Sequence, residues 1–219
     1  AFRNRLLAAA ELERRRLGQD LHDDLCQRLA AIKLRCGMLQ RELVREGSSQ
    51  AGRAAENVDA LGQATALSRS FARNLAPVSL DSNGLSSALQ FLAKSAGTIF
   101  GLVIDYECSQ PASVIDHDTS MHLYRIAQEL IANAAKHARP TRIKMSFAVL
   151  PSTLELEIVN DGLPFSAPAG LTEGMGLHIL RARADAIGAK LDFIAGERPG
   201  GGTCVRCNLP YTYSHENSF

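Results

Sequence analysis

The sequence lacks any apolar run of the roughly 18 residues that a membrane-spanning helix requires, and it shows no signal peptide. It also lacks an excess of charge, because 24 Lys and Arg residues stand against 23 Asp and Glu residues. A chain so close to neutrality is not expected to bind nucleic acid through its overall field. Hydrophobic residues make up 46% of the 219 residues, so the chain can bury the core of one large domain or two small ones.

Cysteine is scarce and follows no framework of spacings. An odd count of 5 in a chain of this size indicates a reduced, cytosolic protein. Cys204 and Cys207 match the C-x-x-C pattern, but they lie in an alternating run that predicts a strand. Residues three apart on a strand point to opposite faces, which argues against both a zinc site and a disulfide.

Proline is absent before Pro77, and this first part of the chain has the texture of long helices. Gly47-Ser48-Ser49 interrupts the pattern, and a second helical pattern runs on to Leu75. Two long helices joined by a short turn bury little by themselves, so we expect residues 1–77 to form a helical hairpin that pairs with a second copy into a dimeric four-helix bundle. The apolar seam of the first helix advances in steps of three and four residues: Leu17, Leu21, Leu25, Leu29, Ile32, Cys36, Leu39 and Leu43.

The texture changes near residue 80, where helical and strand patterns begin to alternate. We expect helices over residues 84–100, 117–138 and 177–188, and strands over residues 102–106, 142–149, 154–159, 190–195 and 203–209. Helices grouped with a mostly antiparallel sheet predict a two-layer α+β domain over residues 78–213, with residues 214–219 as a tail.

A first candidate site lies on the early helix at His22, Asp23 and Gln27. On an α-helix His22 falls on the shoulder of the apolar seam, beside the core and open to solvent, whereas Asp23 and Gln27 share one face at i and i+4. A carboxylate that holds one imidazole proton leaves the other ring nitrogen free to attack, and Gln27 is placed to orient a water. The alternative is a charged helix face that happens to contain one histidine.

A second candidate site is the polar face of the helix expected over residues 117–138. Glu129, Asn133 and His137 follow one another at steps of four, with Lys136 adjacent. Carboxylate and amide oxygens suit Mg²⁺, and a lysine suits phosphate. An ordinary solvated helix face would look similar.

Three glycine clusters complete the pattern. Asn160-Asp161-Gly162 ends a strand, Gly174-Met175-Gly176 opens a helix, and Gly200-Gly201-Gly202-Thr203 precedes the last strand. Glycines before a helix start let backbone N–H groups meet phosphate. The chain has neither the phosphate-binding P-loop motif nor the context of a dinucleotide-binding fold. Three independent turns remain the alternative reading.

Together and in this order, these segments resemble the sensor histidine kinases of the nitrate-sensor and DesK-like type, over residues 13–210. The His-Asp-x-x-x-Gln segment resembles the phosphoacceptor helix of that family. Residues 128–138 resemble its N box, and residues 174–177 its G2 box. The resemblance implies a helical hairpin followed by an ATP-binding domain like those of gyrase and Hsp90.

The resemblance also implies roles for single residues. His22 would be the phosphorylated residue, Asp23 its general base, and Gln27 would position water for dephosphorylation of a response regulator receiver domain. Glu129 and Asn133 would serve Mg²⁺-ATP, both as candidate metal ligands. Other residues would line the nucleotide or flank its mobile lid: Lys136, His137, Asn160, Gly162, Gly174, Gly176, Leu177 and Thr203.

One segment departs from the family pattern Asp-x-Gly-x-Gly. Asn160 stands in place of the aspartate that contacts adenine, and Pro164 in place of the second glycine. An Asn carbonyl still accepts a hydrogen bond but lacks the charge that strengthens it. Asp161 is the worse candidate for the adenine contact, since its register puts Leu163 where a glycine belongs. We expect weaker nucleotide binding or an altered lid.

Two functions remain open on this basis. The first is a cytoplasmic, homodimeric, ATP-dependent kinase core that serves a response regulator. The second is a degenerate module that keeps the dimer and acts as a phosphatase or inhibitory scaffold. Because the chain starts at Ala1 within a helical pattern, we expect an upstream sensor module in a longer protein.

Overall fold

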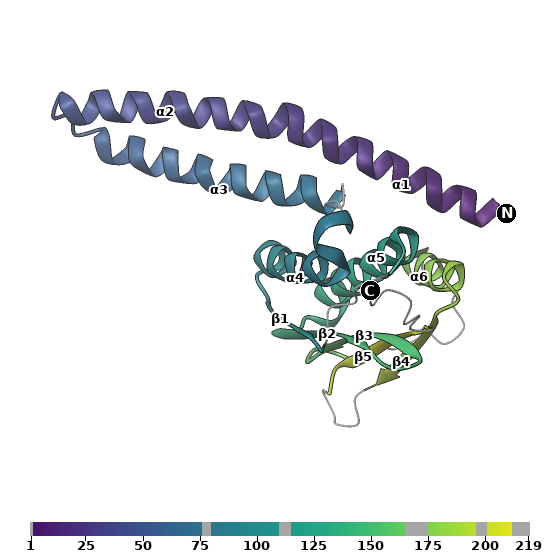
Figure 1. Cartoon of the computed structure of the whole chain (residues 1–219). Helices are drawn as coiled ribbons and strands as arrows, with labels where there is room; N and C mark the ends of the chain where they lie inside the picture. Colours follow the sequence, from purple (N-terminus) through teal and green to yellow (C-terminus); the bar gives the residue numbers. More distant parts are fainter. Residues whose placement is uncertain (1, 76–79, 110–114, 165–174, 196–200, 212–219) are drawn as a thin grey trace, which may run out of the picture. The chain divides into compact units, whose positions relative to one another are not determined.

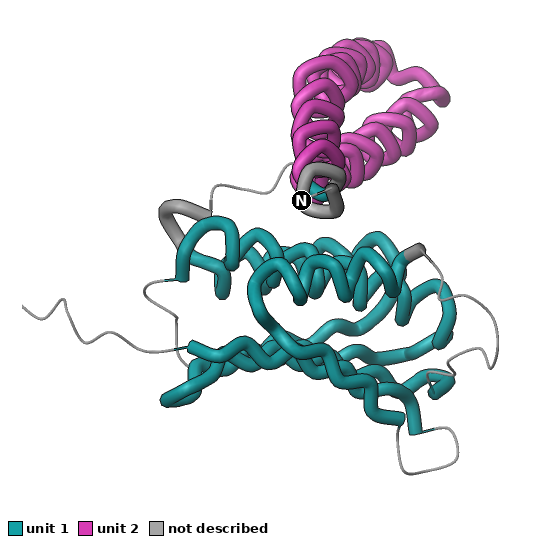
Figure 2. The backbone as a smooth tube through the Cα atoms, turned by 90° about the vertical axis from the view of Figure 1, so that its right-hand side faces the viewer, with its two compact units in different colours: residues 1–7, 79–219 teal, residues 8–78 magenta. Residues whose placement is uncertain are grey.

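The computed structural model describes residues 2–75, 80–109, 115–164, 175–195 and 201–211. The chain divides into two compact units, one of residues 8–78 and the other made chiefly of residues 79–219 (Figure 2). In the described residues, no helix is both long enough and apolar enough to cross a membrane.

The first unit is built from a helical hairpin. Helix α1 (Phe2–Asp20), the π-helical turn η1 (Leu21–Cys26) and helix α2 (Gln27–Arg45) follow one another without a break, and helix α3 (Ala51–Leu75) returns (Figure 1). Gly47 ends the first arm with φ +65°, the left-handed conformation that stops a helix at little cost in glycine. This confirms the predicted break between the two helices.

The hairpin buries little of its apolar surface. No side chain of α2 is buried, and only Thr65 and Ala72 are buried on α3. Much of the predicted seam is exposed in the single chain: Leu17, Leu25, Ile32 and Leu39, with Leu67 and Phe71 on α3. A stable isolated hairpin is not expected to expose an apolar stripe of this extent to water.

The second unit contains a sheet of five strands in the order β1-β2-β3-β5-β4. Strand β1 runs parallel to β2, and all other pairs are antiparallel. The turn at Pro151-Ser152 closes with Leu150 N–H donating to the Thr153 carbonyl at 2.8 Å, which confirms the predicted hairpin. The strands are β1 (Val103–Cys108), β2 (Arg142–Val149), β3 (Thr153–Asn160), β4 (Lys190–Ala195) and β5 (Thr203–Pro210).

Three helices cover one face of this sheet (Figure 1). They are α4 (Leu80–Phe100), α5 (His117–Asn133) with its π-helical continuation η2 (Ala134–Ala138), and α6 (Met175–Ala186). Burial alternates along the central strands, so every second residue packs under the helices. Leu89, Ile126 and Ile143 are fully buried in the shared core. This arrangement confirms the two-layer α+β domain that the element order predicted.

Candidate active site

His22 lies in the π-helical turn η1 and faces solvent. Its Nδ1 is 3.1 Å from Oδ1 of Asp23, and the two side chains are 60% and 72% exposed. A neutral ring that donates from Nδ1 to the carboxylate keeps an unprotonated Nε2 on the other side. The structure therefore sets Asp23 against one nitrogen of His22 and leaves the other accessible.

Gln27 follows η1 directly, and here the local structure differs from the prediction. The expected α-helical spacing placed Gln27 on the face of Asp23, but residues Leu21–Cys26 are π-helical. A π-helix bonds residues five apart rather than four and so needs more residues for each turn. The angle between Gln27 and Asp23 around the helix therefore differs from the α-helical expectation.

The second candidate site lies where α5 meets the start of α6. A side chain placed on Gly176 would have its Cβ 3.0 Å from Glu129 Oε1 and 3.7 Å from Asn133 Nδ2. Glu129 and Asn133 are half-buried on α5 and Leu177 is half-buried on α6. The structure thus brings together residues that the sequence separates by more than 40 positions. Gly174 lies outside the described residues.

Lys136 and His137 are exposed in η2, beyond the end of α5. The sequence predicted that Asn133 and His137 share one face by α-helical spacing. Because the helix widens to π-helical spacing at Ala134, the residues after it are turned relative to that expectation. Both side chains remain at the same end of α5 as Asn133.

The end of strand β3 forms a tight corner with the start of β5. Asn160 is buried, its Oδ1 accepts from Gly162 N–H at 3.0 Å, and its Nδ2 donates to the Thr203 carbonyl at 3.3 Å. A Cβ on Gly162 would lie 2.2 Å from the Ala138 carbonyl oxygen, and Thr203 Oγ1 lies 3.5 Å from the Leu163 carbonyl. Asn160 therefore ties this corner together, and its carbonyl has one further lone pair for a ligand.

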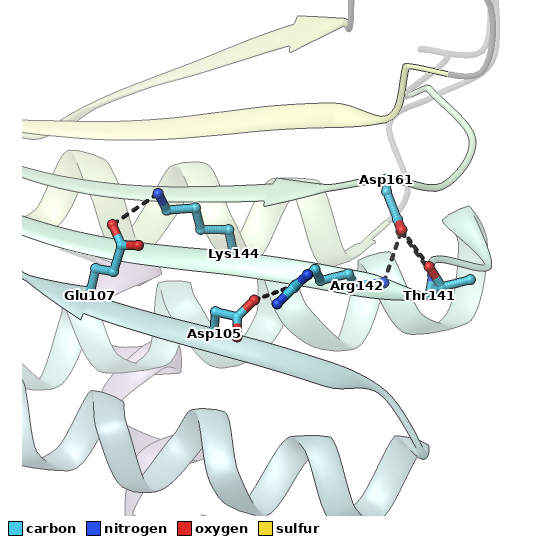
Figure 3. A network of polar contacts seen from close by, with 6 residues as sticks. All are labelled: Asp105, Glu107, Thr141, Arg142, Lys144 and Asp161. Carbon is cyan, nitrogen blue, oxygen red and sulfur yellow. Dashed lines mark hydrogen bonds and ion pairs between the residues drawn. The ribbon is translucent and has the colours of Figure 1, made fainter.

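Asp161 has a structural role that the sequence did not indicate: its side chain binds the start of β2. Its carboxylate accepts from the Arg142 N–H at 2.9 Å, the Thr141 N–H at 2.8 Å and the Thr141 hydroxyl (Figure 3). The hydrogen bond from the Arg142 backbone N–H, followed by those from Thr141, holds the pKa of Asp161 below its usual range. The carboxylate of Asp161 is therefore held at the start of β2.

Next to it, two ion pairs join strand β1 to β2 on the face away from the helices. Arg142 Nε lies 2.5 Å from Asp105 Oδ2, and Lys144 Nζ lies 2.9 Å from Glu107 Oε2 (Figure 3). Arg142 lowers the pKa of Asp105 through its hydrogen bond. Exposed pairs like these add little to stability.

The cysteine pair behaves as the strand pattern predicted. Cys207 is buried in the core, whereas Cys204 lies on the other face of β5 with Sγ 3.5 Å from Glu157 Oε2. Burial raises the pKa of Cys204 to about 11 and that of Cys207 to about 12. The described residues contain no group of three or more His, Cys, Asp or Glu side chains arranged to hold a metal.

Arg125 is a residue that the sequence analysis missed. It is 2% exposed on α5, and its Nη1 donates to Gln128 Oε1 at 2.7 Å. Its guanidinium also lies 5.8 Å from the ring centroid of Tyr124. The sequence signal for it is a charged residue between apolar neighbours on a helix. Charged groups are seldom buried without partners, so such a residue is expected to form buried polar contacts.

Comparison with known proteins gives two family matches. A histidine kinase family model matches residues 13–80, and a model of the histidine kinase-, DNA gyrase B- and HSP90-like ATPases matches residues 118–213. The first match contains the His22 segment, and the second contains both the site at Glu129, Asn133 and Gly176 and the β3–β5 corner at Asn160.

Similar full-length proteins are sensor kinases. The chain is 27% identical over 199 residues to the sensor histidine kinase LiaS of Bacillus subtilis, covering 90% of this chain and 54% of that protein. It is 27% identical over 194 residues to the nitrate/nitrite sensor protein NarQ of Escherichia coli, covering 88% and 34%. It is 30% identical over 213 residues to the histidine-protein kinase/phosphatase UhpB of Salmonella typhimurium, covering 95% and 41%.

The chain thus spans between a third and just over half of the length of these relatives. Among solved structures, the blue-light activated histidine kinase of Erythrobacter litoralis EL346 has the same fold, with a TM-score of 0.54 at 19% identity over 85% of this chain and 60% of that one. The helical hairpin, the two-layer domain and the two family matches agree. This chain belongs to the sensor histidine kinase family and carries its histidine-containing and ATPase-like domains.

Proposed function

We propose that this chain is the catalytic core of a homodimeric histidine kinase, which transfers the γ-phosphoryl group of Mg²⁺-ATP to His22 and then to an aspartate of a response regulator receiver domain. The meeting of Glu129, Asn133 and Gly176 carries the proposal, because it sets two oxygen-bearing side chains beside a helix start that has no side chain of its own. Dephosphorylation of the receiver is the second proposed activity, in line with the kinase/phosphatase name of the relative UhpB.

His22 supplies the nucleophile. Its Nε2 lone pair forms the bond to the γ-phosphorus while the bond from that phosphorus to the bridging oxygen breaks and ADP leaves. Asp23, 3.1 Å from Nδ1, holds the ring in the tautomer whose Nε2 is free. It also stabilises the positive charge that develops on the imidazole. Asp23 therefore acts through His22 as base and electrostatic partner.

Glu129 and Asn133 are the residues suited to hold the metal and its nucleotide. Oxygen donors in a half-open site that leaves room for phosphate match the preference of Mg²⁺, and the missing Cβ at Gly176 keeps that room open. Bound Mg²⁺ supplies neutralisation of the phosphate charge. Lys136 and His137 are exposed at the same end of α5. Lys136 adds positive charge for the phosphates, and His137 adds a hydrogen-bond donor.

The exposed apolar seam of the hairpin supports the proposed homodimer. Ile32 is 45% exposed on the seam, whereas Leu34 is 63% exposed and lies about 200° around the helix from it. We expect Ile32→Glu to turn the dimer into a monomer in light scattering, and Leu34→Glu, the matched control, to leave it intact. A dimer that survives Ile32→Glu contradicts the bundle.

A second function is favoured by one observation, the corner around Asn160. Both ends of its amide are already hydrogen-bonded to protein, and Pro164 supplies no N–H at the entrance to the lid. Poor ATP use would leave a module that dephosphorylates a receiver or occupies it as a scaffold. A cytoplasmic location, and a sensor module like those after which the relatives are named, form part of either proposal.

Radiolabelled ATP separates the two functions. The kinase predicts acid-labile label on the wild-type chain, no label on His22→Gln, and unchanged label on His117→Gln, which removes another exposed histidine. Asn133→Ala should abolish labelling without unfolding the domain, because Asn133 is half-buried and on the site. Absence of label on the wild-type chain, together with dephosphorylation of a receiver, supports the second function instead.

A further inference from the structure

The chain passes from η2 to β2 through a short connection, residues 139–141, whose backbone conformation is unfavourable. Arg139 has φ +49° and ψ +50°, the left-handed region, and it is the one residue other than glycine with positive φ among those that the structure describes. A side chain in this region costs free energy. Pro140 follows, and a residue before proline normally adopts an extended conformation. Arg139 therefore keeps its conformation only because its neighbours are held in place.

The segment that follows strand β3 is bonded to both ends of this connection. At the η2 end, the Leu163 N–H donates to the Ala138 carbonyl at 2.8 Å. At the β2 end, the Asp161 carboxylate accepts from the N–H groups of Thr141 and Arg142 at 2.8 and 2.9 Å, and from the Thr141 hydroxyl (Figure 3). The contact at the η2 end joins backbone groups, whereas the contact at the β2 end depends on the Asp161 side chain.

Gly162 lies between these two contacts and approaches the connection closely. A Cβ on Gly162 would lie 2.2 Å from the Ala138 carbonyl oxygen and 3.0 Å from the Pro140 nitrogen. Ala138 and Pro140 are buried, whereas Arg139 is exposed. The backbone of the connection therefore has little room to shift while both contacts are made.

The connection comes directly after the residues that the proposed function assigns to the phosphates. Asn133 precedes the first residue of η2, and Lys136 and His137 lie in its last turn. Such π-helical turns are rare and occur frequently at functional sites. If the connection relaxed to the extended conformation that Pro140 favours, the end of η2 would move, and Lys136 and His137 would move with it.

We propose that Asp161 is a positioning residue for the phosphate side of the ATP site, which acts through the connection to keep Lys136 and His137 in place. In this role Asp161 does not touch the nucleotide. The inference rests on the proposed function for its ligand, whereas its geometric part concerns the protein alone. It differs from an adenine contact by Asp161 and from general support of the fold, and both of these can be tested against it.

A comparison of ATP with adenosine, by titration calorimetry on the whole chain, separates the phosphate side from the adenine side. We expect Asp161→Ala to weaken ATP binding about tenfold and to leave adenosine binding within about twofold of wild type. An adenine contact predicts the same fold-loss for both ligands, and so does a smaller folded fraction. Equal losses, or an unchanged affinity for ATP, overturn the inference.

Asp105→Ala is the matched control. The Asp105 carboxylate also binds Arg142, but through the side-chain Nε rather than the backbone N–H, and it makes no printed bond to the connection in the described residues. Its removal should change neither affinity. A loss of ATP binding in Asp105→Ala as large as that in Asp161→Ala overturns the inference, because the effect would then not depend on the connection.

The strain at Arg139 provides a rescue test. Glycine adopts the left-handed region without steric cost, so adding Arg139→Gly to Asp161→Ala should restore ATP affinity to within about threefold of wild type. Arg139→Ala removes the same charged side chain but keeps the strain, and it should restore nothing. Rescue by both substitutions, or by neither, overturns the inference.

Hydrogen exchange tests the geometry without a nucleotide. The amides of residues 134–139 should exchange faster in Asp161→Ala than in Asp105→Ala, and equal exchange overturns the inference. If the wild-type chain binds no ATP, the proposed function fails and hydrogen exchange alone decides the geometry. Should Asp161→Ala prevent folding in circular dichroism, Thr141→Val takes its place. It removes the hydroxyl from the same contact, should weaken ATP but not adenosine, and has Thr141→Ser as its control; equal losses for the two ligands again overturn the inference.

Discussion

Replacing Gly202 with alanine should unfold the ATPase-like domain far more readily than the same change at Gly188. Both glycines have positive φ, +71° and +70°, so alanine at either costs about 1–2 kcal/mol in backbone conformation. Only Gly202 is also crowded. A Cβ on Gly202 would lie 1.7 Å from the Asn160 carbonyl oxygen, whereas a Cβ on Gly188 would have no neighbouring atom within 4 Å.

The steric part can be worked out from the pairing of β3 with β5. Asn160 and Thr203 are register partners, so the clash falls on the first rung of that ladder. Relieving it to 3.0 Å needs a shift of about 1.3 Å between two backbone segments, and close-packed interiors resist such shifts. We expect about 3 kcal/mol of further destabilisation. At about 4 °C per kcal/mol, Tm should fall by about 5 °C for Gly188→Ala and about 17 °C for Gly202→Ala.

Near-ultraviolet circular dichroism is a suitable assay. The chain has no tryptophan, and all 4 tyrosines follow residue 100, so the tyrosine signal reports on the ATPase-like domain and not on the hairpin. Nucleotide affinity should fall in Gly202→Ala as well, because Asn160 and Thr203 form the corner of the candidate site. Equal Tm values for the two variants, within about 2 °C, would refute the steric reasoning.

Three further predictions concern other parts of the same domain. In thermal melts, Asp161→Asn should lower stability by the same amount at every pH between 5 and 8. Because the folded-state pKa of Asp161 is lowered, the difference in stability from wild type should shrink as the pH falls below about 4. Arg125→Met should cost about 1–3 kcal/mol in urea unfolding, since Gln128 Oε1 loses a buried donor, and a neutral result would contradict that support. Cys204 and Cys207, with pKa values raised to about 11 and about 12, should resist alkylation at pH 7.5 in the folded protein, and mass spectrometry that finds Cys207 labelled would count against the fold.

Much of the fold could be predicted because its signals are local. The break at Gly47, the β2–β3 hairpin and the helix from Met175 follow from glycine positions and from periods of two or about four residues. The π-helical turn at Leu21–Cys26 was not predicted, because its leucines recur at steps of four, a spacing that a regular α-helix also accommodates.

The sequence by itself determined which chemical groups the chain carries and on which kind of element each lies, since residue type and hydrophobic period are properties of short segments. The tertiary structure alone decided which of them meet. Gly176 clears space beside Glu129 and Asn133, and Asn160 reaches Thr203 across 43 positions. Asp161 is bound to the start of β2 rather than left free for a ligand. These outcomes depend on strand register and helix packing, which bring distant residues within a few ångströms and which no local pattern encodes.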